Sequence, residues 1–407
     1  FIQLFDVLDR QPEYDEEGIF HRVPAMKRSQ LSNLKRHLYR QILTSLRLIH
    51  AQKYPDIDIR EQVDFARILY GKGLYTQSLK VLDRAKEQAK GIHQDILHLE
   101  ILEFEKQIES RHVTRAMEDR AETLAAEAER RGQIVATVSR LSNLALQLYS
   151  LYIKIGHVRT EKDALTLANL FKNNLPSIDV ERLTFFERVH YYQANVWYYY
   201  IQQNFPLHYR YCQKWVDLFE EFPLMKEQDK ELYMRGLHDL LTAHFYTSGH
   251  ERLVTGLVQL EKFIEAERET FNMNEEVQAY TYLYTAKINR HYLEGTFSEG
   301  LPLVPEIAAF LKKYDEYLDD HRILVFYYKI ACLYFGSGDN GKAIDWLNNI
   351  INYKAGSLHG DIQCYARILH LIAHFELRHF NLLEYLVKSV YRFLAKMEDL
   401  NQVQKEI

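Results

Sequence analysis

The segment from Arg322 to Lys354 restricts the possible folds of this chain more than any other part of it. Apolar residues recur there at helical spacings on both sides of Gly338, which places them on one face of each of two consecutive helices. These faces consist of Tyr327, Ile330, Ala331 and Tyr334 before the glycine and Ala343, Leu347 and Ile350 after it. Ala331 and Ala343 are small enough to let the two helices approach closely. The segment predicts a helix-turn-helix hairpin, which needs stacked neighbours to bury its apolar face.

Turns of the same kind recur along the chain. We mark them at Tyr75, Val113, His157, Phe205, His250, Phe297, Asn340 and Phe380, with spacings from 38 residues (Tyr75 to Val113) to 48 residues (His157 to Phe205). Together with the hairpin around Gly338, this pattern resembles the tetratricopeptide repeat (TPR), whose standard period is about 34 residues. The resemblance implies an all-α fold, specifically an α-α superhelix: a TPR-like solenoid of about eight helical hairpins, with longer helices or connections than the family norm.

The copies match the family pattern unequally. The seventh, around Gly338, fits best, and the first and fifth also fit. Repeat 2 fits poorly, because Thr114 to Arg131 is alanine-rich and acidic. Repeats 3, 4, 6 and 8 keep the apolar spacing but lack the expected small residue, as Val196 and Ile288 illustrate. We therefore expect a helical stack with an irregular superhelix.

Composition supports long helices and an intracellular setting. The 407 residues include only 16 Gly and 8 Pro but are 47% hydrophobic, which favours long helices joined by short loops. Cys212, Cys332 and Cys364 offer neither a disulfide framework nor a CxxC pair, so we expect a reducing, cytoplasmic location. No apolar run approaches the roughly 18 residues of a membrane span. Because the chain starts at Phe1 rather than Met, we expect a fragment or a processed product.

We predict three regions. Residues 1–56 form an acidic segment followed by a basic amphipathic helix that packs on the solenoid, residues 57–380 form the TPR-like hairpins, and residues 381–407 form the last helix. The basic helix runs from Ser29 to Gln52, within a stretch from His21 to Pro55 that holds eight bases and no acid. We favour neutralisation by acidic segments of the same chain over binding of nucleic acid, an anionic membrane or an acidic partner. With a net charge of -5 and no DNA-binding motif, no nucleic-acid partner is expected.

The last helix carries an apolar seam of residues spaced four and three apart. Its members are Leu386, Val390, Phe393, Met397 and Leu400. The final helix of a solenoid has one side that no following repeat covers. The seam is therefore interpreted either as a cap completed by downstream residues or as the contact of a homodimer.

No sequence pattern supports catalysis. Gly336 to Lys342, GSGDNGK, has the spacing of a phosphate-binding loop, but a helical pattern precedes it and Ala343 takes the place of the required Ser or Thr. His370 and His374 lie one helical turn apart, yet no HExxH or Cys/His set accompanies them. We interpret the first as a repeat turn and the second as packed histidines. We expect no enzyme activity, no metal and no cofactor.

In the TPR family the first helices of the hairpins line a concave groove that holds an extended peptide or a helix. Carried over by repeat position, the groove residues would be Arg67, Tyr70, Trp197, Tyr200, His238, Thr242, Phe245, Asn289, Tyr292, Tyr328, Phe335, Ile372 and Phe375. Only Asn289 resembles the clamp that some family members use for a peptide carboxylate, so that ligand is disfavoured. An aromatic groove instead suits apolar or proline-containing segments.

The resemblance implies a non-enzymatic scaffold that binds a protein or peptide segment on its concave face. The alternative is that the chain is the sensor or regulatory part of a larger signalling or transcription protein, whose effector domain lies outside this sequence.

Overall fold

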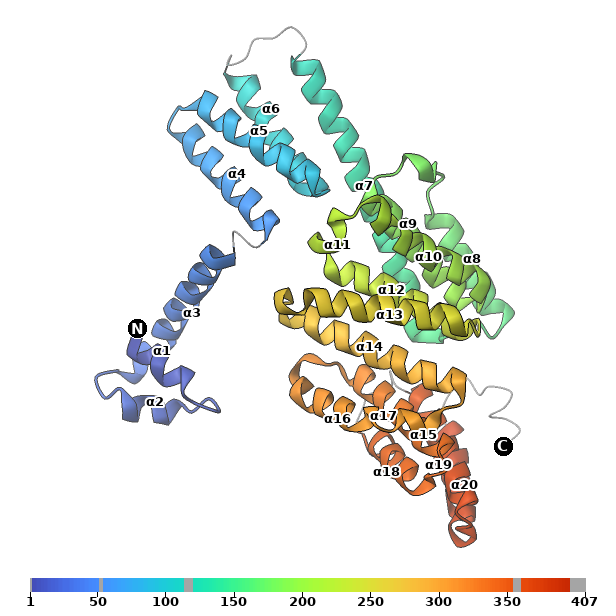
Figure 1. The fold of residues 1–407 in the computed structure, drawn as a ribbon. Helices are drawn as coiled ribbons and strands as arrows, with labels where there is room; N and C mark the ends of the chain where they lie inside the picture. Colours follow the sequence, from blue (N-terminus) through green and yellow to red (C-terminus); the bar gives the residue numbers. More distant parts are fainter. Residues whose placement is uncertain (1, 51–53, 113–119, 354–359, 396–407) are drawn as a thin grey trace. The chain divides into compact units, whose positions relative to one another are not determined.

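The computed structural model describes residues 2–50, 54–112, 120–353 and 360–395, and these are helical with no β-strand among them (Figure 1). The prediction of an all-α protein is confirmed. None of the helices in this described part has both the length and the hydropathy needed to cross a membrane. The chain divides into two compact units, residues 1–135 and 136–407, and the boundary falls inside one long helix.

The first unit holds two groups of helices with separate cores. Its helices are α1 (Ile2–Asp9), α2 (Glu16–Arg22), α3 (Arg28–His50), α4 (Pro55–Gly71), α5 (Tyr75–Gly91), α6 (Asp95–Arg111) and the start of α7 (Arg120–Ile155). Leu4, Ile19 and Leu31 join α1, α2 and α3 in one cluster. A second cluster joins α4, α5 and α6 through residues such as Ile59, Leu82 and Ile101. Each group thus buries its own apolar faces.

Helix α3 is the predicted basic helix, and Gln52 lies outside the described residues. Its Arg28 pairs with Glu17 at 2.6 Å, and Arg47 lies 3.4 Å from Asp64 of α4. These pairs agree with neutralisation inside the chain for part of the positive charge. Leu46 and Ile49, near the end of α3, are exposed. The packing of this end on the repeats stays a prediction.

The second unit contains the rest of α7 and the helices that follow it. They are α8 (Glu161–Asn174), α9 (Phe185–Ile201), α10 (Phe205–Glu221), α11 (Leu224–Gln228), α12 (Lys230–Tyr246), α13 (His250–Glu267), α14 (Met273–Glu294), α15 (Phe297–Gly300), α16 (Leu303–Lys313), α17 (Asp320–Gly336), α18 (Asn340–Ile351), α19 (Gly360–Glu376) and α20 (Phe380–Leu394), with single 3₁₀ turns at Val180–Arg182, Arg268–Thr270 and Asp315–Tyr317. Helices α9, α10, α12 and α14 pack in succession, and α17 to α20 do the same. The largest fully buried side chains here are Trp215, Phe185, Phe219 and Phe326.

Among the described residues, seven helices end in the same backbone turn. In each, one residue has a positive φ and lies two positions before the next helix. The residues are Gly73, His93, Gln203, Ser248, Gly295, Gly338 and Arg378. In each turn the following N–H bonds to the carbonyl five residues earlier, for example Asn204 N to Tyr199 O at 2.9 Å and Asp339 N to Tyr334 O at 3.0 Å. This is the Schellman hydrogen bond. Six of these turns precede the predicted markers Tyr75, Phe205, His250, Phe297, Asn340 and Phe380, whereas the turn at His93 was not predicted and Val113 lies outside the described residues.

Helix α7 differs from the sequence prediction. We read Thr114 to Arg131 as the second helix of repeat 2, separate from the first helix of repeat 3. Residues 114–119 lie outside the described part, but the rest continues without a break to Ile155 in one helix of 36 residues. Gly132 is the single glycine in this helix, which has no proline, and one glycine costs a helix only about 1 kcal/mol. The alanine-rich sequence therefore favours continuation over a turn.

Helix α20 contacts α19 through part of the predicted seam. Val390 is buried beside Cys364, and the Arg367 guanidinium lies 4.3 Å from the centre of the Phe393 ring. Met397 and Leu400 lie outside the described residues. The chain itself thus covers the middle of the seam, and the homodimer stays a prediction.

Candidate functional site

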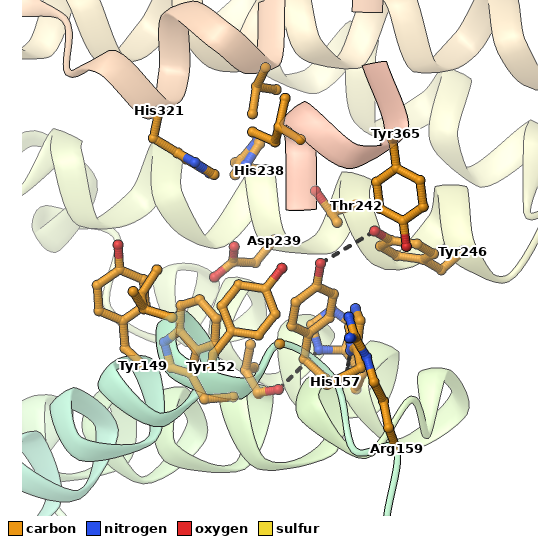
Figure 2. Close-up of a pocket in the computed structure, with 18 residues that line it drawn as sticks. Tyr149, Tyr152, His157, Arg159, His238, Asp239, Thr242, Tyr246, His321 and Tyr365 are labelled. Carbon is orange, nitrogen blue, oxygen red and sulfur yellow. Dashed lines mark hydrogen bonds between the residues drawn. The ribbon is translucent and has the colours of Figure 1, made fainter. Parts of the chain in front are cut away.

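One cavity of the second unit brings together side chains from helices that are distant in the sequence (Figure 2). It has a volume of about 640 Å³. The lining residues are Tyr149, Tyr152 and Ile153 of α7; Gly156, His157 and Arg159 of the following loop; Val196, Trp197 and Tyr200 of α9; His208 of α10; His238, Asp239, Thr242 and Tyr246 of α12; His321 and Val325 of α17; and Ile362 and Tyr365 of α19. Figure 2 shows His321 and Tyr365 across the cavity from Tyr149 and Tyr152.

Helices α7 and α9 supply an aromatic wall. Tyr149 and Tyr152 are three residues apart on α7, as are Trp197 and Tyr200 on α9, so each pair shares a helix face. The Trp197 ring centre lies 5.1 Å from that of Tyr149 and 5.6 Å from that of Tyr152. Other residues of α9, Val189 and Tyr192, are buried in the core of the unit. The aromatic residues on more than one face of α9 therefore divide between core and cavity.

The loop after α7 is held against α9. Val158 N donates to the Ile201 carbonyl at 2.9 Å, and His157 Nδ1 lies 3.0 Å from the Tyr200 carbonyl. Gly156 has a φ of 65°, which permits the sharp exit from α7. The loop thereby places His157 beside the Tyr200 ring, with 4.8 Å between their centres.

Tyrosine hydroxyls meet at one end of the cavity. Tyr200 OH and Tyr246 OH are 3.3 Å apart (Figure 2), and burial raises the pKa of Tyr200 well above its ordinary value. The Tyr200 phenol is therefore neutral near pH 7, and both hydroxyls can donate or accept hydrogen bonds. These two hydroxyls make this end of the cavity polar.

Helix α12 contributes a neutral histidine and a carboxylate. The His238 ring stacks on Tyr282, with centres 4.0 Å apart, and burial lowers its pKa to about 3. Asp239 faces the cavity (Figure 2), and burial raises its pKa to about 6 even though Arg235 acts in the opposite direction. No other residue in the described part forms a hydrogen bond or ion pair with the Asp239 carboxylate. It is a partly buried anion without a fixed partner.

The groove residues that we predicted do not all lie together. Trp197, Tyr200, His238 and Thr242 line the cavity. Asn289, Tyr292 and Lys329 instead form a packed group of their own, in which Tyr292 OH donates to the Lys329 carbonyl at 2.6 Å and Lys329 Nζ donates to Asn289 Oδ1 at 2.6 Å.

The other predicted residues also lie away from the cavity lining. Phe245 contacts Tyr292, with ring centres 6.4 Å apart, while Tyr328 and Phe335 are half-buried on α17. Ile372 and Phe375 are exposed on α19. In the first unit, Arg67 pairs with Glu100 at 3.0 Å and lines a shallow pocket with Tyr70.

Several lining residues were absent from the sequence prediction. Tyr149 and Tyr152 were missed because no groove residue was taken from repeat 3, although their spacing matches that of Trp197 and Tyr200. Asp239 directly follows the predicted groove residue His238 but was not itself predicted. His321 and Tyr365 reach the cavity through the arrangement of helices distant in sequence, which no local pattern reveals.

The two other motifs singled out in the sequence lie on or between helices in the described part of the chain. GSGDNGK links α17 to α18, and Asp339 Oδ1 accepts a hydrogen bond from Lys342 N at 3.1 Å as a helix cap. A helix therefore precedes the motif where a phosphate loop needs a strand. His374 Nδ1 lies 2.9 Å from His379 Nδ1, and the described residues contain no metal-binding group of three or more His, Cys, Asp or Glu side chains.

Comparisons with known proteins found no match: no family model, no curated protein and no solved structure is similar to this chain.

Proposed function

We propose that the second unit is a TPR-like solenoid that captures a segment of a partner protein in its aromatic cavity, without catalysis. The observation that carries the proposal is the origin of the cavity lining. Most of it comes from α7, α9, α12, α17 and α19, which are the first helices of hairpins in the repeat reading. The family resemblance places a partner against those helices. The repeated Schellman turns support the same repeat reading.

The chemistry of the cavity suits large anchoring side chains. Tyrosine and tryptophan offer apolar area with few rotatable bonds, and they dominate the binding energy of many protein interfaces. Trp197, Tyr149 and Tyr152 supply such area around one hollow. A segment with one or two bulky residues would bury them there, while its flanking backbone contacts the surrounding helices.

A sensor of small molecules is the second candidate, because the cavity volume of about 640 Å³ lies within the roughly 300–1,000 Å³ of typical ligand pockets. In that case the chain would regulate an effector domain outside this sequence. For either function we propose a cytoplasmic location, since Cys212, Cys332 and Cys364 are all free thiols.

Selection from a random peptide display library tests the scaffold proposal. The wild-type protein should enrich a family of related segments, and Trp197→Ala should reduce the binding of those segments by about tenfold or more. Phe375→Ala is the matched control, because it also removes an aromatic ring from a first helix but lies outside the cavity lining. Equal loss in both variants, or no enrichment at all, would contradict the proposal.

A further inference from the structure

We infer that this cavity recognises an organic cation, a guanidinium or alkylammonium group, with Asp239 as its anionic partner and the surrounding aromatic rings as its walls. The inference rests on the proposed use of the same cavity and specifies what enters it. The cation would be a side chain of the captured segment or, for a sensor, a free small molecule.

The first support is the unsatisfied state of Asp239. A carboxylate removed from water is costly unless an opposite charge or hydrogen-bond donors compensate. The described residues provide neither a hydrogen bond nor an ion pair to this carboxylate. Arg235, one turn earlier on α12, lowers the pKa of Asp239 only through its electrostatic field. Burial raises the pKa by more, so it stands at about 6. A cation in the cavity would supply the missing partner.

The second support is the nature of the walls. The faces of tyrosine and tryptophan rings carry partial negative charge and attract cations within about 6 Å. Tyr152 is tilted against both Trp197 and Tyr200, with ring centres 5.6 Å and 5.4 Å away. Rings tilted in this way present faces in several directions, as in sites that enclose ammonium groups. Asp239 and these rings line one hollow.

The basic side chains near Asp239 are few, and each is either neutral or held elsewhere. His238 beside it and His208 behind α9 are kept neutral by burial, which lowers their pKa values to about 3 and 4. His157 is held at the Tyr200 carbonyl, and His321 lies on α17 across the cavity. Arg159 comes from the loop after α7 and has other interactions in the chain. The positive charge that acts on the pKa of Asp239 is that of Arg235, which lies one turn earlier on α12.

Tryptophan fluorescence offers a direct test, because Trp197 lies in the lining. The probes are a capped tetrapeptide, acetyl-Gly-Pro-Arg-Gly-amide, its citrulline counterpart and free butylguanidinium. Citrulline keeps the shape of arginine but carries no charge. At pH 8 the arginine peptide should bind at least about tenfold more tightly than the citrulline peptide. Trp197→Phe should abolish the signal and so assign it to the cavity.

Asp239→Asn is the decisive variant, since it keeps the shape of the side chain and removes its charge. It should weaken binding of the arginine peptide by about tenfold or more, while Asp345→Asn on α18, outside the cavity lining, leaves binding unchanged. Circular dichroism of each variant establishes that the helices are retained. Equal binding of the arginine and citrulline peptides, unchanged binding by Asp239→Asn, or no response to any probe up to about 10 mM would overturn the inference.

Two comparisons distinguish a peptide ligand from a small-molecule ligand and separate this inference from the scaffold function. Butylguanidinium binding as tightly as the peptide indicates a small-molecule ligand, whereas tighter peptide binding indicates a protein segment. Display-selected segments that depend on Trp197 but lack Arg and Lys, and that bind Asp239→Asn unchanged, would overturn this inference and leave the scaffold function standing. If display enriches nothing, the scaffold function fails and the butylguanidinium titration alone decides the inference.

Discussion

The ring of Phe297 on α15 covers Gly336 at the end of α17 so closely that a Cβ atom at position 336 would lie 2.4 Å from it. A side chain there must displace the ring, so Gly336→Ala should destabilise the protein by about 1–3 kcal/mol. Urea unfolding followed by circular dichroism measures the effect.

Gly341 of the same GSGDNGK motif is the matched control. A Cβ atom there meets only Asp339 Oδ1, at 3.7 Å, so Gly341→Ala should leave stability unchanged or raise it by less than about 1 kcal/mol. If both alanine variants lost the same stability, close packing of Phe297 would not be the reason for the first glycine.

The Schellman turns predict opposite effects of substitutions at equivalent positions. Gln203 and Ser248 have φ values of 59° and 51°, which cost an L-residue about 1–2 kcal/mol relative to glycine. Glycine also loses more entropy on folding, so Gln203→Gly and Ser248→Gly should each stabilise the chain by about 0.5–1 kcal/mol.

The reverse substitution, Gly338→Ala, should lower the free energy of unfolding by about 1 kcal/mol or more, because φ is 87° at this position. The added Cβ atom would meet no other atom, so no new contact would offset this loss. Thermal unfolding of the three variants and the wild type decides the matter. Destabilisation by both glycine substitutions would show that the native side chains stabilise these turns.

His208 predicts that the protein loses stability in mild acid. Its ring is buried, Nδ1 lies 3.1 Å from the Val196 carbonyl, and burial lowers its pKa from 6.5 to about 4. As the pH falls below 6.5, the unfolded chain gains a proton on this residue that the folded chain does not bind. The free energy of unfolding should therefore fall between pH 6.5 and 4, by at most about 3 kcal/mol from His208.

Urea unfolding midpoints across this pH range measure the contribution of His208. His208→Gln should flatten the acid limb. An acid limb that keeps its slope in His208→Gln would refute the assignment.

Asp239 predicts a stability effect of the opposite sign. Its pKa is raised from 3.8 to about 6, so the unfolded chain releases this proton at lower pH than the folded chain. Stability is therefore lost as the pH rises from about 4 to 6, and the full cost applies above pH 6. Asp239→Asn should raise the free energy of unfolding by about 1–2 kcal/mol at pH 8, less than the full shift implies because the side chain is partly exposed.

At pH 3.5 Asp239→Asn and the wild type should be equally stable, since the aspartate is then neutral in the folded protein. Calorimetry at the two pH values measures both points. A variant less stable than the wild type at pH 8 would mean that the carboxylate stabilises the fold and does not await a ligand.

Sequence patterns located the turns better than the site. Gly73, Gly295 and Gly338 mark positions where φ is positive, so the predicted turns there agree with the helix ends. In contrast, the alanine-rich part of α7 contains no comparable signal, and its continuation into the next helix was missed. Local pattern thus succeeds where a single residue controls the backbone and fails where propensity alone decides.

The candidate site shows the same limit. Trp197 and Thr242 were found because repeat position fixes the face of a helix. His321 and Tyr365 were not found, because their position opposite Tyr149 depends on how several helices pack against one another. A spacing rule reads one helix at a time, whereas the cavity is a product of many.

The turn made by Gly73, Gln203, Ser248 and Arg378 alike is closed by main-chain atoms. The hydrogen bond that closes the turn therefore does not depend on the side chain at this position. Glycine, polar and charged residues all occupy this position in the protein. Each non-glycine residue there costs local conformational energy because its φ is positive. Different side chains can therefore occupy this left-handed position while the same backbone hydrogen bond closes the turn between two helices.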